Sequence, residues 1–403
     1  MSIDGAAPTN DGPLTGVRVL DLTAAVLGPV ATMHLGDLGA DVIKIEPPEG
    51  EFMRALGPSR NPGMGAYFLT INRNKRSVVL DLKSEVGRAA LMKFAESADV
   101  LVHNMRMAAA GRMGLTWAAR SARNPRIILA AGVGFDQRGR YRDRPAYDDI
   151  VQGESGIPAL IARANGEPRF LPMAMADKLV GLQLASAIGM ALYRRERTGK
   201  GQEVQVPMLE TMVAFNLIDH MWSAVLDEPE KGIGYPRMFT PHRRPYATKD
   251  GHVCLLANTD EQWARMFTVL GEPALAKDPR FATFKARTAN IDTLLGLVAA
   301  RMKTRTTAEW RAMLDYADIP NGAMNSLGDI LDDRHLADIG FFERMEHPSE
   351  GRTVMMGVAP RFSESPGGIR RGAPRLGEHS NEVLVEAGFT AEEIVLLCSR
   401  RSQ

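Results

Sequence analysis

The chain has 403 residues, 45% of them hydrophobic and 24% charged, which is ordinary for a globular protein with a large buried core. Its formal net charge of +1 argues against a surface that binds nucleic acid along the whole chain. Only two cysteines are present, Cys254 and Cys398, far apart and without CxxC spacing, so neither a disulfide framework nor a cysteine zinc site is expected.

We also expect a cytoplasmic location and no membrane partner. The N-terminal stretch MSIDGAAPTNDGPLTG is polar and acidic, unlike a signal peptide. The most apolar stretch, 177–197, is interrupted by Gln183 and Ser186 and ends in the basic turn YRRER, so no run of transmembrane length is expected. The eight histidines show neither HxxxH nor HExxH spacing, which argues against a catalytic metal.

Short apolar runs that alternate with helical stretches predict an α/β fold with a parallel sheet buried on both faces. The expected strands are Val17–Leu22, Val42–Glu46, Val78–Leu82, Val100–His103, Arg126–Ala131 and Glu203–Val206. The longest expected helix covers Asp177–Arg197, and another follows over about Leu209–Leu226.

The amino-acid composition changes at DEPEKGIGYPRMFTPHRR, a stretch rich in proline, glycine and charged residues. We therefore expect a large domain over 1–226, a linker over 227–245 and a smaller α+β domain over 246–327, with 328–403 following. The smaller domain begins with an expected hairpin over Tyr246–Leu256, which turns at Asp250-Gly251.

Asp177 is the most informative single residue, because it precedes a long apolar helix. Most aspartates in such a place only cap the helix. In the alternative, the helix dipole keeps the carboxylate ionised while Leu179, Val180 and Leu182 exclude water, which suits a covalent nucleophile. A second carboxylate, Asp148, would orient or tune Asp177 if the fold brings the two together, and otherwise forms a turn or cap.

Basic residues cluster near the ends of successive expected strands. Such clusters either grip phosphate groups or form a solvated rim. The residues concerned are Arg73, Lys75, Arg76, Lys83, Arg106 and Arg112.

Taken together, the motifs give a specific resemblance. They are VRVLDLTAAVLGPVATMHLGDLGADVIKIEPP, FLTINRNKRSVVLDLK, ADVLVHN, GRMGLTW, NPRIILAAGVGF, YDDIVQGESG, ADKLVG, RRERTGKGQEVQV and GAPRLGEHSNEVL. In this order they resemble the class III CoA-transferase family, which includes formyl-CoA transferase, carnitine CoA-transferase and the related α-methylacyl-CoA racemases.

This resemblance implies a Rossmann-like large domain built from both chain ends, a smaller domain, and a homodimer whose chains interlock like rings. It implies no permanently bound cofactor, with coenzyme A (CoA) and a carboxylic acid as substrates. Asp177 would form an aspartyl anhydride and then an aspartyl-CoA thioester, with Asp148 assisting. The implied CoA-binding residues are Val26, Leu27, Leu80, Lys83, Asn104, Met105, Arg112 and Tyr147.

Departures from the family pattern bear on specificity. Formyl-CoA transferases carry Gln at the position of Val26 and Arg at the position of Pro47. The absence of both residues here argues against oxalate and formate as the substrate pair. Racemases carry His at the position of Tyr147. The absence of this histidine favours CoA transfer over racemisation. A racemase or isomerase and a non-catalytic CoA-binding scaffold remain the alternatives. Arg243 and Arg244 either bind a dicarboxylic acid or are surface charges of the linker.

Overall fold

The structure, a computed structural model, describes residues 12–399 and divides into two compact units. The first unit contains the chain up to Ser155, Leu171–Ala214 and the chain from Arg334 onward. The second contains Gly156–Phe170 and Phe215–Asp333. The boundaries thus differ from those expected at 226 and 327, and the expected linker 227–245 belongs to the second unit and contains helical turns. The N-terminal segment 1–11, expected to differ from a signal peptide, lies outside the described residues.

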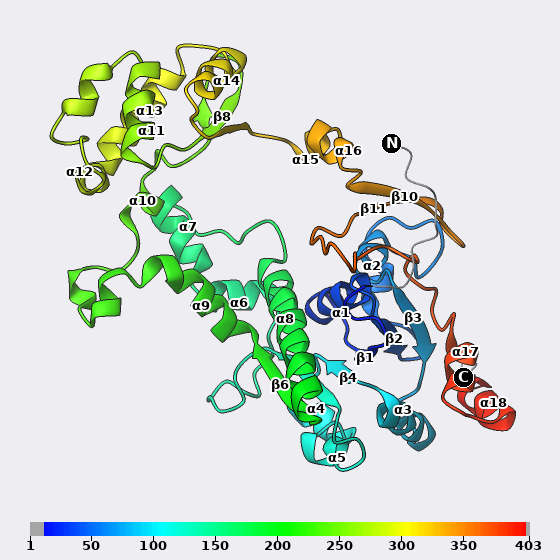
Figure 1. The fold of residues 1–403 in the computed structure, drawn as a ribbon. Coiled ribbons are helices and arrows are strands. Elements are labelled where there is room, and N and C mark those ends of the chain that lie inside the picture. The colour runs from blue at the N-terminus through cyan, green and yellow to red at the C-terminus, as the bar shows by residue number, and fades with distance from the viewer. Residues whose placement is uncertain (1–11, 400–403) are drawn as a thin grey trace. The chain divides into compact units, whose positions relative to one another are not determined.

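The first unit is built on a sheet of six parallel strands in the order β3-β2-β1-β4-β5-β6 (Figure 1). The strands are β1 (Arg18–Leu22), β2 (Asp41–Glu46), β3 (Lys75–Val79), β4 (Val100–His103), β5 (Ile128–Val133) and β6 (Gln202–Pro207). The chain leaves β1 toward one edge of the sheet and β4 toward the other, so the strand order reverses between them. In open α/β sheets, ligands bind at the carboxyl ends of the strands at this reversal.

The parallel α/β sheet expected from the sequence is confirmed, with one shift of strand position. The apolar run Val78–Leu82 predicts β3 three residues too late, because Lys75 begins the strand and is fully buried. A lysine at that position lowers the apolar signal, although its ammonium is paired inside the protein.

Helices cover both faces of the sheet. The first unit contains α1 (Leu27–Asp37), α2 (Ala66–Ile71), α3 (Glu85–Ser97), α4 (Met107–Arg112), α5 (Trp117–Ser121), α6 (Asp148–Glu154), α8 (Met175–Thr198), the start of α9 (Met208–His220), α16 (Arg334–Asp338), α17 (Ser380–Glu386) and α18 (Ala391–Ser399), with a 3₁₀ turn, η1 (Phe52–Ala55). It also holds the antiparallel hairpin of β10 (Phe342–His347) and β11 (Gly351–Met356).

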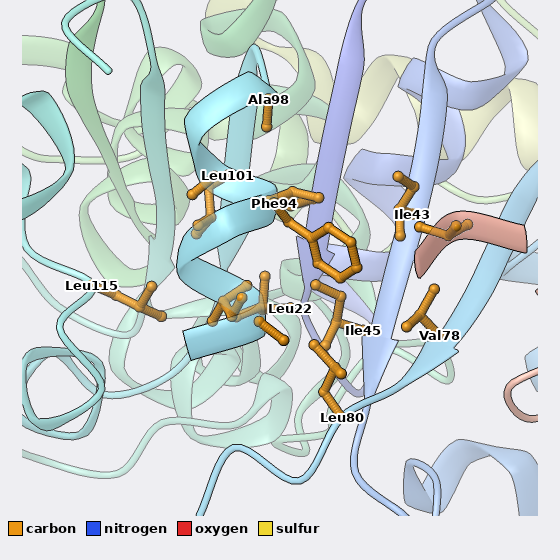
Figure 2. Close-up of a cluster of buried hydrophobic side chains, with 14 of the residues drawn as sticks. Leu22, Ile43, Ile45, Val78, Leu80, Phe94, Ala98, Leu101 and Leu115 are labelled. Carbon is orange, nitrogen blue, oxygen red and sulfur yellow. The ribbon is translucent and has the colours of Figure 1, made fainter. Parts of the chain in front are cut away.

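One face of the sheet packs under α3 and the C-terminal helices. Figure 2 shows Phe94 of α3 among strand side chains that include Leu22 and Ile45. Val383 of α17 and Ile394 of α18 belong to the same buried cluster, so the chain returns from the second unit to complete this core. Helices α1 and α8 pack against each other and against the strands.

The basic residues at the start of β3 are neither phosphate ligands nor an exposed rim. Arg73, Lys75 and Arg76 are buried. Arg73 pairs with Asp37 at 2.7 Å, and Lys75 pairs with Asp21 at 3.0 Å. These side chains hold the unit together, because a buried charge is tolerated only when it is paired.

The second unit has its own core around a three-stranded antiparallel sheet in the order β7-β8-β9. Its strands are β7 (Tyr246–Ala247), β8 (His252–Leu255) and β9 (Asn321–Ala323). Its helices are α7 (Ile157–Asn165), the rest of α9, α10 (Pro236–Phe239), α11 (Asp260–Val269), α12 (Phe284–Ala289), α13 (Ile291–Met302), α14 (Thr307–Tyr316) and α15 (Leu327–Leu331), with 3₁₀ turns η2 (Trp222–Leu226), η3 (Pro229–Lys231) and η4 (Pro273–Lys277). The hairpin expected over Tyr246–Leu256 is present as β7 and β8.

Helix α8 has 24 residues and a mean hydropathy of 1.2 over its most apolar window. By length and composition alone, it is the one helix in the described part of the chain that could cross a membrane. This differs from the expectation that Gln183 and Ser186 interrupt the apolar run. The core helices of soluble proteins pass the same test.

Candidate active site

A cleft of about 220 Å³ opens at the carboxyl ends of the central strands, in the first unit. Its walls come from the segment after β1, with Ala25 and Leu27, and from the segment after β4, with Asn104 and Met105. Asp177 lines the same cleft. Because β1 and β4 flank the reversal of strand order, the cleft lies where α/β sheets bind ligands.

Asp177 is the third residue of α8, and the helix cap is Ala174. The expectation that Asp177 caps the helix is therefore wrong. One turn further along the same face, a Cβ added to Gly181 would lie 2.6 Å from the carbonyl oxygen of Leu27. Only glycine permits this approach, which places the first turns of α8 against the start of α1 and brings Asp177 beside the loop that follows β1.

Asp148, the first residue of α6, is buried and directly bonded to the segment that carries Asp177. Its Oδ1 accepts the backbone N–H of Asp177 at 3.0 Å, and its Oδ2 accepts from Nε2 of Gln152 at 2.5 Å. The fully buried Gln152 side chain also accepts the N–H of Leu171 at 2.9 Å, ahead of α8. The two carboxylates singled out in the sequence are thus held together, with Gln152 fixing both α6 and the approach to α8.

The electrostatics of Asp177 differ from the expectation. Burial, and then the neighbouring charge of Asp148, raises the pKa of Asp177 from 3.8 to about 7. The N-terminal turn of a helix favours an ionised aspartate, but here burial and like charge outweigh that effect. Burial and the charge of Asp148 therefore make the ionised form of Asp177 unfavourable at neutral pH, whereas the sequence led us to expect a stabilised carboxylate.

Tyr67 on α2 lies within reach of the charges of both carboxylates, and it is not among the residues expected from the sequence. Its half-buried phenol has a raised pKa, first because of burial and then because of the charges of Asp177 and Asp148. Its ring packs against a cluster that contains Val26. The stretch FLTIN around it reads as a simple apolar helix, so only the three-dimensional arrangement reveals Tyr67.

The remaining expected CoA-binding residues fall into two groups. Leu27, Asn104, Met105 and Tyr147 line the cleft with Asp177. The others lie elsewhere in the first unit: Val26 is buried behind Tyr67, Leu80 is in the core, and Lys83 and Arg112 are exposed outside the cleft lining.

Asn104 lines the cleft, and its side chain is also bonded to the segment that follows β1. Its side chain donates to the carbonyl of Ala24 at 2.7 Å and accepts the N–H of Ala24 at 3.0 Å. Its amide is therefore engaged by the protein backbone although the residue lines the cleft.

Three arginines line the cleft, Arg106, Arg142 and Arg144. Arg142 pairs with Asp143 at 3.3 Å and Arg144 with Glu154 at 2.5 Å, and only Arg106 is among the basic residues expected from the sequence. Arg243 and Arg244 are exposed residues of the second unit. Among residues 12–399, no group of three His, Cys, Asp or Glu side chains is arranged to hold a metal ion.

Comparison with known proteins gives a consistent result. The model of CoA-transferase family III matches residues 14–380. The succinyl-CoA:glutarate CoA-transferase of Mus musculus is 33% identical over 391 residues, which cover 96% of this chain and 89% of the relative. The succinyl-CoA–D-citramalate CoA-transferase of Chloroflexus aurantiacus is 32% identical over 400 residues, covering 96% and 98%.

Solved structures agree with this similarity. A CAIB/BAIF family protein from Brucella suis superposes with a TM-score of 0.77 at 30% identity, covering 94% of this chain and all of that one (100%). Rv3272 from Mycobacterium tuberculosis gives a TM-score of 0.79 at 28% identity, covering 92% and 98%.

Proposed function

The chain belongs to CoA-transferase family III and is a CoA transferase, and from this premise we propose that Asp177 carries the reaction as a covalent nucleophile. The observation that supports this most is the position of Asp177 in the cleft, half-buried, beside Asp148 and with its pKa raised to about 7. A carboxylate of raised pKa is more basic, and therefore a better nucleophile, than an ordinary aspartate.

The proposed reaction proceeds by four balanced exchanges. A carboxylate oxygen of Asp177 attacks the thioester carbonyl of the donor, the C–S bond breaks, and CoA leaves as its thiolate. The thiolate attacks the side-chain carbonyl of the resulting anhydride, which gives an aspartyl-CoA thioester and releases the donor acid as a carboxylate. The acceptor carboxylate then attacks the carbonyl of this thioester, the C–S bond breaks, and CoA leaves again as its thiolate, which gives a second anhydride. The thiolate finally attacks the acceptor's acyl carbon, which gives the new acyl-CoA and regenerates Asp177.

The surroundings of Asp177 favour the first of these exchanges. Ionised Asp177 is destabilised by burial and by Asp148, and acylation converts it into a neutral anhydride. The energetic cost of the buried charge is therefore released as the covalent bond forms.

Asp148 and Tyr67 have distinct proposed roles in this site. Asp148 accepts the backbone N–H of Asp177, and its charge adds to burial in raising the pKa of Asp177. Tyr67, whose phenol feels the charges of both carboxylates, is proposed as a neutral hydrogen-bond donor for the acyl oxygen that gains charge in the transition state.

We propose a dicarboxylic acid as one substrate. The relatives described above are named for succinyl-CoA with glutarate or D-citramalate, and each of these acids carries a second carboxylate. Arg106, Arg142 and Arg144 give the cleft positive charge for this group and for the phosphates of CoA. Arg243 and Arg244 remain the candidates from the second unit.

The covalent step is tested with succinyl-CoA as donor. Incubation followed by borohydride or hydroxylamine is expected to modify Asp177, detected by mass spectrometry of the peptide. Asp177→Asn is expected to abolish both modification and transfer, whereas Asp149→Asn, a change at a neighbouring exposed aspartate, retains both. An unmodified Asp177 together with active Asp177→Asn would contradict the mechanism.

Substrate choice is tested separately with a panel of mono- and dicarboxylic acceptors. Arg243→Ala and Arg244→Ala are compared with Arg106→Ala and Arg142→Ala. The variant that loses dicarboxylates while retaining monocarboxylates identifies the residue that binds the distal carboxylate. Equal use of both acid classes by the unaltered protein would exclude the dicarboxylate proposal.

We further propose that the protein works as an interlocked homodimer in the cytoplasm. Helix α8 exposes Leu182, Met190 and Tyr193, with 51%, 69% and 65% of their surface accessible. Such a row of apolar side chains is typical of an interface, and a second copy of the chain is the partner that we propose. Light scattering on the purified protein tests this, with a monomer as the contrary result.

A further inference from the structure

The turn that joins β1 to α1, Thr23–Val26, forms a wall of the cleft and is held in an unusual conformation. Ala25 has a φ of +64°, in the left-handed region that side chains other than glycine rarely adopt. Ala25 and Leu27 both line the cleft with Asp177. A strained turn persists only where its surroundings fix it, and such turns cluster at functional sites.

Two side chains from distant segments bond adjacent residues in the middle of this turn, Ala24 and Ala25. Asn104, which follows β4, makes both of the hydrogen bonds that the backbone of Ala24 offers, at 2.7 and 3.0 Å. Glu51, which is only 7% exposed, accepts the N–H of Ala25 at 3.0 Å. Neither side chain is close in sequence to the turn.

Glu51 is itself held by a charge network under the turn. Its other carboxylate oxygen lies 2.8 Å from Nζ of Lys44, which also donates to the carbonyl of Thr23 at 2.9 Å. Asp21 accepts the N–H of Thr23 at 2.9 Å and pairs with Lys75 at 3.0 Å. Lys44, Asp21 and Lys75 are fully buried. Their mutual pairing makes the network rigid, since displacing one member leaves another buried charge without its partner.

We propose that Glu51 and Asn104 are positioning residues for the reaction at Asp177, acting through the turn Thr23–Val26. This inference rests on the proposed function and deepens it. The start of α1 lies directly against α8 at Gly181, one turn after Asp177, so the turn sets the wall that faces the attacking carboxylate. Asn104 therefore serves the cleft through Ala24, in contrast to the CoA-binding role that the sequence indicated.

The proposal is tested by following covalent modification of Asp177 in single turnovers with succinyl-CoA at saturating concentration. Glu51→Ala and Asn104→Ala are each expected to slow this rate about 10- to 100-fold, the loss typical of a small misplacement of reacting groups. The KM for succinyl-CoA is expected to change by less than about threefold, because neither side chain is proposed to contact it. Glu49→Gln, at an exposed carboxylate of the same segment, is the matched control and retains the full rate.

A double variant provides a second readout that a merely structural role would not move. Because both residues act through one turn, Glu51→Ala combined with Asn104→Ala is expected to react nearly as fast as the slower single variant. If the rate loss of the double variant instead equals the product of the two single losses, the two residues act independently, and the proposal that both act through this turn is refuted. If Asn104→Ala instead raises KM and leaves the saturating rate unchanged, Asn104 binds CoA and the proposal fails for it.

Glu51→Gln keeps the size of the side chain, so it distinguishes a loss of rate caused by misfolding from one caused by the lost contact. Both neighbours of Glu51, the Ala25 N–H and Lys44, are donors, whereas glutamine has one acceptor oxygen. An intermediate rate is expected, and a rate equal to that of the unaltered protein would refute the role of Glu51. The two proposals fail in different ways: an unmodified Asp177 in the unaltered protein contradicts the mechanism, and full rates in the variants contradict only the positioning.

Discussion

Replacing Asp177 with asparagine is expected to stabilise the fold while it abolishes transfer, and the gain depends on pH. In the folded protein the pKa of Asp177 is about 7, against an ordinary 3.8. The folded state therefore binds a proton between these values that the unfolded state has released, and stability falls as pH rises through this window. A difference of this size corresponds to at most about 4 kcal/mol at pH 8. Water at the half-buried carboxyl screens the effect, so about 2 kcal/mol is the expected gain.

The measurement is urea unfolding of Asp177→Asn and of the unaltered protein between pH 4.5 and 8.5. The difference in unfolding free energy is expected to be smallest at the acid end, to grow up to about pH 7 and then to level off. Asp149→Asn, at an exposed carboxylate, is expected to show no such growth. A constant difference across the range, or one that shrinks as pH rises, would refute the argument that burial and Asp148 raise this pKa.

Three further substitutions test the site and the buried charges. Asp148→Asn removes the like charge beside Asp177, so the pH at which single-turnover modification reaches half its maximum is expected to fall below about 7; an unchanged midpoint contradicts the coupling. Tyr67→Phe keeps the ring against its apolar neighbours but removes the donor, so the rate of modification is expected to fall about tenfold or more with unchanged stability. Arg54→Met leaves buried Glu46 without its ion pair at 2.6 Å, and unfolding measurements are expected to show a loss of about 3–5 kcal/mol.

Much of the fold could be predicted from the sequence because parallel strands buried on both faces leave continuous apolar runs. Val100–His103 was placed correctly, as was the hairpin of β7 and β8. The start of β3 was missed because its lysine and arginine are buried in ion pairs, which apolarity cannot detect. Gly156–Phe170 was not assigned to the second unit, because membership of a unit depends on contacts between distant segments.

Within the candidate site, only the residues that belong to family motifs could be predicted from the sequence. The family pattern drew attention to Asp177 and Asp148, which the fold brings together. The pKa of Asp177 was not predictable, because it depends on burial and on a carboxylate 29 residues away. Tyr67 and Glu51 could not be predicted, since the effect of the Asp177 charge on Tyr67 and the hydrogen bond from Ala25 to Glu51 exist only once the strands and helices have assembled.

The C-terminal helices have a consequence for how the chain is made. Arg76 at the start of the sheet pairs with Glu382 and Glu386, and Ile394 fills part of the same core as β1 and β2. During synthesis, the strands emerge from the ribosome long before these partners do. The second unit, whose own core uses residues up to Ile319, is complete first. Part of one face of the nascent sheet, beside α3, is therefore uncovered until translation is nearly finished, and exposed apolar surface of this kind favours aggregation.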